Sequence, residues 1–204
     1  MLINDLAKTV HENAVAHGWW EGERDISEIV ALIHSEWSEA LEEARAGRPL
    51  VYRICADCID GPCSVEPDTA TACGFDAAKH KPEGIAVELI DGVIRILDFM
   101  GAEETDVSES ETGEPTTFES LYTVVGKNAD MTAGVPALVA FLHMHTSAFL
   151  VHVADVTDSD LYELLCAMSM ALIWVHRQGI DPLALLLEKH EYNKGRPYKH
   201  GKNF

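Results

Sequence analysis

The sequence predicts an all-α fold in which amphipathic helices pack as a bundle. Apolar residues recur with helical spacing along most of the 204-residue chain. We find no convincing stretch of alternating apolar and polar residues that would indicate a β-strand. The composition agrees, because 47% apolar and 24% charged residues are typical of a globular domain and exclude wholesale disorder.

Two helices are expected before the first irregular segment. The first runs from the N-terminus to about Gly18, where a glycine ends the apolar pattern. The second opens at Asp25, which with Glu28 matches a capping box, and it stops at Gly47. Residues 49–81 then form a loop-rich insertion that contains four of the five cysteines.

Further helices are expected after the insertion. The third begins at Pro82 and ends at Gly101. Residues 102–117 are acidic and rich in Ser and Thr, which is typical of a flexible linker. Beyond this linker the pattern predicts a short helix and then three longer ones, over 118–127, 136–154, 159–177 and 181–195, the last with Asp181 as its N-cap and Pro182 at its first position.

The two parts of the chain resemble each other. At an offset of 109 residues, Ile26–His34 aligns with Val135–His143, and a shift of 78 places Leu89–Gly101 over Ala167–Gly179 less convincingly. Two unrelated amphipathic helices also look alike, so this alternative stays open. If the two parts are related, residues 1–101 form the first half and residues 118–204 form a degenerate second half.

The charge of the chain excludes some classes of partner. The chain carries 34 acidic and 15 basic residues, a net charge of −19. Such a chain repels nucleic-acid phosphate and anionic lipid, so we expect it to bind neither. It contains no apolar stretch long enough to span a membrane and no secretory leader, so a soluble cytoplasmic protein is expected. The basic residues concentrate in 189–204, where a basic tail could close over an anionic ligand.

Four carboxylates with helical spacing indicate a metal site. Glu36 and Glu39 lie three residues apart on the second helix, as do Glu88 and Asp91 on the third. Each pair projects from one side of its helix, and carboxylate oxygens favour Mg²⁺ or Mn²⁺. The alternative is a solvated acidic face. The third helix argues against it, because its charged residues form one narrow stripe on an otherwise apolar helix.

These motifs resemble those of a known family. Their order, with the ExxE pair first, the ExxD pair second and a terminal KxxxNxxR formed by Lys189, Asn193 and Arg196, is similar to that of the all-α nucleoside triphosphate pyrophosphohydrolases. This superfamily includes MazG, dimeric dUTPase and dCTP pyrophosphatase. Upstream, His11 and Trp20 stand where members similar to dCTP pyrophosphatase keep base-contacting residues.

The resemblance implies an activity and a set of roles. The expected reaction is Mg²⁺-dependent cleavage of an NTP or dNTP to the monophosphate and pyrophosphate, as in house-cleaning or nucleotide-pool control. The four carboxylates would bind the metal and carry catalysis. The KxxxNxxR residues would hold the β and γ phosphates, and His11 and Trp20 would contact the base. Some relatives have a further glutamate where this chain has Ser35, so the general base is not assigned.

The chain also departs from the family in its architecture. The gap between the two acidic motifs is unusually long, and KxxxNxxR follows the second half instead of the ExxD helix. Under the offsets above, the four carboxylates fall on residues that cannot form the same cage, namely His145, Ala148, Cys166 and Ser169. One active site per chain is therefore expected, and a homodimer is compatible with this arrangement.

Two other functions compete with this interpretation. An acidic helical interaction protein would need no site at all, and a carboxylate-bridged di-iron bundle would need Glu-x-x-His, which neither motif supplies. The insertion raises a separate question, because Cys55, Cys58, Cys63, Cys73 and His80 could bind zinc. Only one CxxC is present, and reduced cysteines without metal are the competing expectation.

Overall fold

The structure is a computed structural model that describes residues 1–55, 80–107, 114–123, 134–152 and 161–201. About 70% of these residues are helical, and they form seven α-helices and one small two-stranded hairpin. None of the helices in these ranges combines the length and apolar character needed to cross a membrane. The elements are α1 (Ile3–Ala16), α2 (Ile26–Arg45), β1 (Tyr52–Cys55), β2 (His80–Glu83), α3 (Ile85–Ala102), α4 (Ser120–Thr123), α5 (Val135–His152), α6 (Leu161–Arg177), α7 (Pro182–Lys194) and the 3₁₀ turn η3 (Tyr198–Gly201).

The predicted N-caps of α2 and α7 are confirmed. The Asp25 side chain accepts a hydrogen bond from the Ser27 backbone N–H at 2.6 Å. Asp181 accepts one from the Leu183 backbone N–H at 3.0 Å, and Pro182 occupies the first turn of α7. The capping box at α2 is only half formed, because the Glu28 side chain pairs with a neighbouring arginine instead of reaching back to the cap.

The expectation of a fold without strands is corrected by the hairpin at the base of the insertion. β1 and β2 pair antiparallel, with Cys55 opposite His80. Pro82 lies in β2, so α3 begins three residues later than predicted. Gly84 precedes α3 with a φ of 114°, and a Cβ there would lie 2.7 Å from the Leu50 carbonyl oxygen. This close approach to backbone, at a positive φ, requires glycine.

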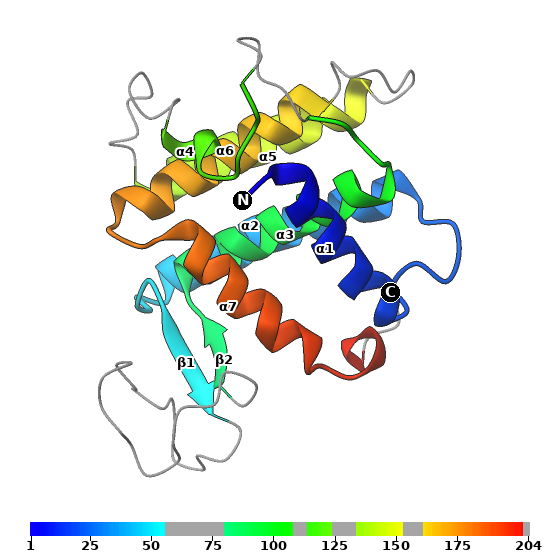
Figure 1. Cartoon of the computed structure of the whole chain (residues 1–204). Coiled ribbons are helices and arrows are strands. Elements are labelled where there is room, and N and C mark those ends of the chain that lie inside the picture. Colours follow the sequence, from blue (N-terminus) through cyan, green and yellow to red (C-terminus); the bar gives the residue numbers. More distant parts are fainter. Residues whose placement is uncertain (56–79, 108–113, 124–133, 153–160, 202–204) are drawn as a thin grey trace.

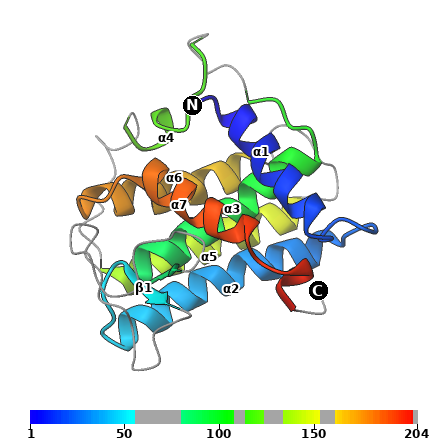
Figure 2. The same ribbon diagram turned by 60° about the horizontal axis from the view of Figure 1, so that its bottom comes forward.

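The centre of the bundle is α3. It contacts α1, α2, α6 and α7, and α2 in turn contacts α5 (Figure 1). Figure 2 shows α2 and α3 running in opposite directions, with α7 crossing in front of α3. Because α3 is covered on several sides, most of its residues are buried. Its charged side chains reach solvent between the neighbouring helices.

Close packing holds α3 against its neighbours. A Cβ at Gly92 would lie 2.2 Å from the Trp37 ring of α2, and one at Gly101 would lie 2.7 Å from the Ala7 carbonyl oxygen of α1. Trp37 is fully buried, and its Nε1 donates a hydrogen bond to Thr146 Oγ1 of α5 at 3.0 Å. The indole therefore has no room to move away from α3.

The helices of the two parts of the chain pack on one another in the same order. α2 packs on α3 as α5 packs on α6, and α1 covers α3 as α4 covers α6. His34 and His143 stack with their Nδ1 atoms 2.7 Å apart, and Trp37 meets Thr146. Both contacts join residues 109 positions apart, the offset that aligns the halves. A two-fold relation brings equivalent residues together at its axis. The two related halves stay a prediction.

Part of the predicted linker is attached to the N-terminus. Asn4 donates a hydrogen bond to Asp106 at 2.8 Å, and Leu2 pairs with Thr117 in an isolated bridge. Val107 packs against the core. The intervening residues 108–113 lie outside the described residues. Both ends of the linker are therefore fixed to α1.

The contact between α3 and Trp37 gives a stability prediction. We expect Gly92→Ala to lower the free energy of unfolding by about 1–3 kcal/mol, because the added methyl group overlaps an indole that cannot move. Urea denaturation measures this change. The matched control is Gly22→Ala, where a Cβ would meet nothing within 4 Å. Equal stability of the wild type and Gly92→Ala would contradict the packing described above.

Candidate functional site

The charged stripe of α3 faces a cleft. Glu88, Asp91, Arg95 and Asp98 follow one another at helical spacing and all line the same hollow. Spacings of three and four residues keep side chains on one face of a helix. The stripe singled out in the sequence is thus the floor of a cavity instead of a solvated surface.

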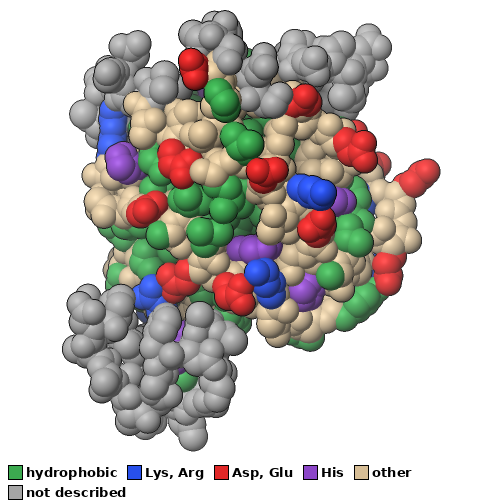
Figure 3. All heavy atoms as spheres, viewed as in Figure 1, with side chains coloured by type: hydrophobic (Ala, Val, Ile, Leu, Met, Phe, Trp, Pro, Cys, Tyr) green, Lys and Arg blue, Asp and Glu red, His purple; other side chains and the backbone are tan. Residues whose placement is uncertain are grey.

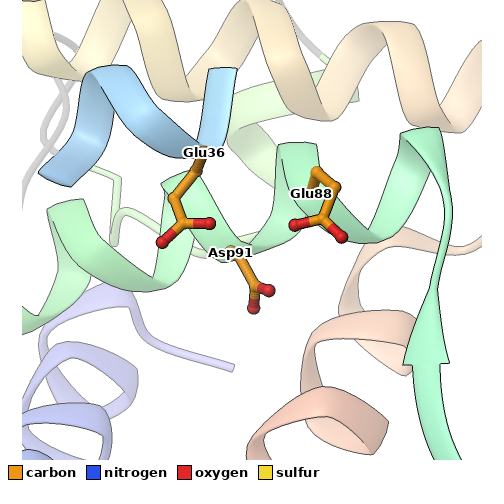
Figure 4. A group of neighbouring side chains, drawn as sticks. All are labelled: Glu36, Glu88 and Asp91. Atoms are coloured by element: carbon orange, nitrogen blue, oxygen red, sulfur yellow. The ribbon is translucent and has the colours of Figure 1, made fainter. Parts of the chain in front are cut away.

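Three carboxylates meet on this floor. Glu36 of α2 and Glu88 and Asp91 of α3 each offer an oxygen atom, and these atoms lie within 4.8 Å of one another (Figure 4). Glu36 and Glu88 are buried, with 7% and 4% of their surface exposed. Solvated acidic faces do not bury their carboxylates. We call these three residues the carboxylate triad.

Glu39 does not join the triad. It lies one turn beyond Glu36 on α2, is exposed to solvent, and lines the same cleft. The structure therefore brings together three of the four carboxylates expected to bind metal and leaves the fourth at the edge.

Two cations, the half-buried Arg95 and the buried Lys189, neutralise part of the triad. Arg95 pairs with Glu36 at 2.8 Å, and the Lys189 ammonium of α7 pairs with Asp91 at 2.8 Å. Lys189 is 2% exposed and also donates to the Pro82 carbonyl oxygen at 3.2 Å. Burial alone would lower the pKa of Lys189, but Asp91 and the neighbouring glutamates outweigh it and raise that pKa. Lys189 therefore stays charged.

Glu88 is the triad carboxylate that forms no ion pair with Arg95 or Lys189. Burial, the charge of Asp91 and a hydrogen bond with Glu83 raise the pKa of Glu88 to about 9. Burial also raises the pKa of Glu36, although Arg95 opposes that shift. At neutral pH Glu88 thus holds a proton that a divalent cation could displace. The buried oxygen donors suit a hard cation, so the triad fits a metal ion; its identity is not fixed by the donors alone.

The cleft is enclosed by four helices. α1, α2, α3 and α7 line an empty volume of about 1020 Å³ that opens to solvent. Four basic side chains line the same cleft as the triad, namely Lys81, Arg95, Lys189 and Arg196. Figure 3 shows basic and histidine side chains among the acidic ones in the middle of one face of the molecule. These four cations share the cleft with five carboxylates, so an anionic ligand is favoured only once a metal ion or a proton neutralises carboxylates of the cleft.

The wall formed by α7 carries the KxxxNxxR residues. Lys189 and Asn193 of α7 line the cleft, and so does Arg196, two residues beyond the end of that helix. Asn193 Oδ1 and His190 Nε2 are buried and have no hydrogen-bond partner among the described residues. Buried polar groups without partners are rare, and a bound ligand is one explanation for them. Sequence reasoning missed His190, although it lies three residues before Asn193 on the same face of α7.

His11 and Trp20 contact the cleft through Asp98. His11 Nδ1 lies 2.9 Å from Asp98 Oδ1, and Trp20 Nε1 donates to the same oxygen at 2.9 Å. The rings of His11 and Trp20 meet edge to face, and the Arg24 guanidinium lies 5.2 Å from the Trp20 ring centre. Trp19, which sequence reasoning did not single out, lines the cleft itself.

The C-terminal segment closes against the end of α1. The Lys199 backbone N–H donates to the His17 carbonyl oxygen at 2.9 Å, and Tyr198 packs on Gly18 and hydrogen-bonds to Glu21. Gly18 has a φ of 80°, and a Cβ there would overlap the tyrosine ring. This contact fixes the segment that follows Arg196 beside the cleft.

In the second half, the positions that align with the four carboxylates form no comparable cluster. His145 pairs with Glu163 at 2.6 Å, and Ser169 is buried in the core. Among the described residues, the triad is the only group of three or more metal-ligating side chains found together. In the insertion, Cys55 and His80 lie opposite each other, whereas Cys58, Cys63 and Cys73 fall outside the described residues. The zinc site stays a prediction.

The raised pKa of Glu88 predicts a pH-dependent stability. The ordinary glutamate pKa is 4.5 and the folded protein raises it to about 9, so the folded state binds the proton more tightly. The free energy of unfolding of metal-free protein should therefore fall as the pH rises between these two values. Glu88→Gln removes this dependence, so the variant should gain stability relative to the wild type from about pH 6 to pH 9. Urea denaturation in the presence of a metal chelator measures the free energy of unfolding of the wild type and of the variant across this pH range.

The control for this experiment is Glu12→Gln, which removes an exposed carboxylate of α1 and should follow the wild type at every pH. Parallel stability curves for the wild type and Glu88→Gln would show that Glu88 titrates normally, against the account of the triad.

Comparison with known proteins gave no match to a family model, to a curated protein or to a solved structure. The chain is a mostly helical protein with a buried acidic cluster.

Proposed function

We propose that the chain is a Mg²⁺-dependent nucleoside triphosphate pyrophosphohydrolase, which cleaves an NTP or dNTP between its α and β phosphates. Its products are the monophosphate and pyrophosphate. One observation carries the proposal: a buried carboxylate triad faces a wall of cations and unpartnered polar groups across a single cleft. The motif resemblance to the all-α pyrophosphohydrolases supports the same activity.

The triad would hold the metal. Glu36, Glu88 and Asp91 supply the hard oxygen donors that Mg²⁺ and Mn²⁺ prefer. When bound, the metal supplies positive charge that orients a water for attack and stabilises the negative charge on the reacting phosphate. Glu39, at the open edge of the cleft, either completes the metal site or accepts the proton of that water.

The α7 wall would hold the rest of the polyphosphate. The Arg196 guanidinium has no ion pair among the described residues, although it lines the cleft. Its planar donor fork matches the oxygens of a phosphate, and Lys189 adds a compact charge. Asn193 lies between them in the sequence, and its side-chain NH2 group can donate to a phosphate oxygen. A nucleoside triphosphate would use the contacts with Lys189, Asn193 and Arg196 together, whereas a monophosphate would not.

Removal of a triad carboxylate should abolish turnover. We expect Asp91→Asn and Glu88→Gln to lower kcat by about 100-fold or more, because a metal that is lost or misplaced no longer supports the reaction. The measurement is pyrophosphate release from a panel of NTPs and dNTPs, with and without Mg²⁺. Glu12→Gln is the control variant. If no nucleotide gave pyrophosphate, the interaction-protein alternative would replace this proposal.

Removal of the free guanidinium should weaken substrate binding. We expect Arg196→Ala to raise KM roughly tenfold, with a smaller change in kcat, since a charged hydrogen bond contributes about 1.5–3 kcal/mol. The control is Lys194→Ala, because Lys194 is exposed on α7 and pairs with Glu191. Equal KM values for the two variants at several salt concentrations would assign the basic tail to general charge balance instead of phosphate binding.

A further inference from the structure

We propose that Asp98 recognises an amino group on the base of the bound nucleotide, so that the cleft selects cytosine, adenine or guanine nucleotides over those of uracil, thymine or hypoxanthine. This inference rests on the proposed function. It concerns the part of the substrate that neither the triad nor the α7 wall would contact.

The position of Asp98 on α3 suits the base. Asp98 lies seven residues after Asp91 on the same face, which is a rise of about 10 Å along the helix. A nucleotide whose phosphates lie at the triad reaches this distance with its base, since the sugar is adjacent to the α-phosphate. Both carboxylates line one cleft, and Arg95 lies between them on the same face of α3.

The hydrogen bonds of Asp98 determine what it can still bind. Oδ1 accepts from Trp20 Nε1 at 2.9 Å and contacts His11 Nδ1 at 2.9 Å. Oδ2 has a longer contact of 3.2 Å with Trp20. The side chain is 14% exposed, so one edge of it remains accessible. An ionised carboxylate only accepts hydrogen bonds. An exocyclic amino group placed at this edge can therefore donate to the carboxylate, whereas a carbonyl oxygen in the same place is repelled.

The surroundings of Asp98 suit the flat faces of a base. Ile94, one turn earlier on α3, and Ala14 of α1 line the cleft with apolar atoms. α2 and α3 run antiparallel (Figure 2), and Glu36 meets Arg95, so Leu32 lies one turn closer to Asp98. An apolar surface with one polar group that fixes orientation is typical of a small-molecule site.

The test compares pairs of nucleotides in which one member carries an exocyclic amino group that the other lacks. We measure kcat/KM with Mg²⁺ for the pairs CTP and UTP, ATP and ITP, and GTP and ITP, and for the deoxy forms of each. The wild type should prefer the amino member by about tenfold or more in at least one pair, as expected for a hydrogen bond to a charged acceptor. This part of the test needs no variant.

Asp98→Asn then separates recognition from structure. The indole N–H of Trp20 needs an oxygen acceptor, so the amide nitrogen should take the place of Oδ2 and present donors to the base. The preference should vanish or reverse toward UTP and ITP. A purely structural role for Asp98 would lower kcat/KM for both members of a pair equally. Glu12→Gln should keep the wild-type preference.

Three results would overturn the inference. The first is equal kcat/KM for both members of every pair, to within about twofold, in the wild type. The second is an unchanged preference in Asp98→Asn, and the third is discrimination that follows the ribose hydroxyl instead of the base. Each of these leaves the pyrophosphohydrolase standing, because pyrophosphate is still released. The absence of release from every nucleotide overturns the proposed function, and this inference with it.

Discussion

The neutralisation of buried carboxylates is the constraint on which the cleft depends. Glu36, Glu88 and Asp91 lie too close together to be ionised without cations nearby. Arg95 and Lys189 balance Glu36 and Asp91, and Glu88 takes up a proton instead. Lys189 also joins α7 to α3 and β2, so the same ion pair that balances charge places the wall of the cleft. A divalent cation, when it binds, would neutralise the charge of these carboxylates instead.

The position of α3 makes this arrangement possible. Gly92 and Gly101 let Trp37 and α1 approach the helix backbone, and most other residues of α3 are buried among apolar neighbours. The charged stripe can then open only into the gap bounded by α1, α2 and α7. One stripe thus carries two groups of contacts: the triad and its cations at one end, and Asp98 with His11 and Trp20 about two turns away.

Helical periodicity predicted much of this fold, because helix caps and apolar stripes are local signals. The caps at Asp25 and Asp181 and the stripe of α3 were predictable in this way. The hairpin was not, since strands of four residues with a proline carry too little alternation to be recognised. The exposure of Glu39 and the partners of Asp98 depend on how helices far apart in sequence pack. Spacing gives the face of a helix that a residue occupies, but not its depth or its partner on another helix.

The most direct test of the account is the binding of Mn²⁺ followed by electron paramagnetic resonance in the absence of nucleotide. The account predicts that the wild type and Glu12→Gln take up the ion at one class of site, and that Glu36→Gln and Asp91→Asn each lose it while remaining folded. Unaltered Mn²⁺ binding in these two triad variants, or no binding by the wild type, would contradict the claim that the buried carboxylates form a metal site.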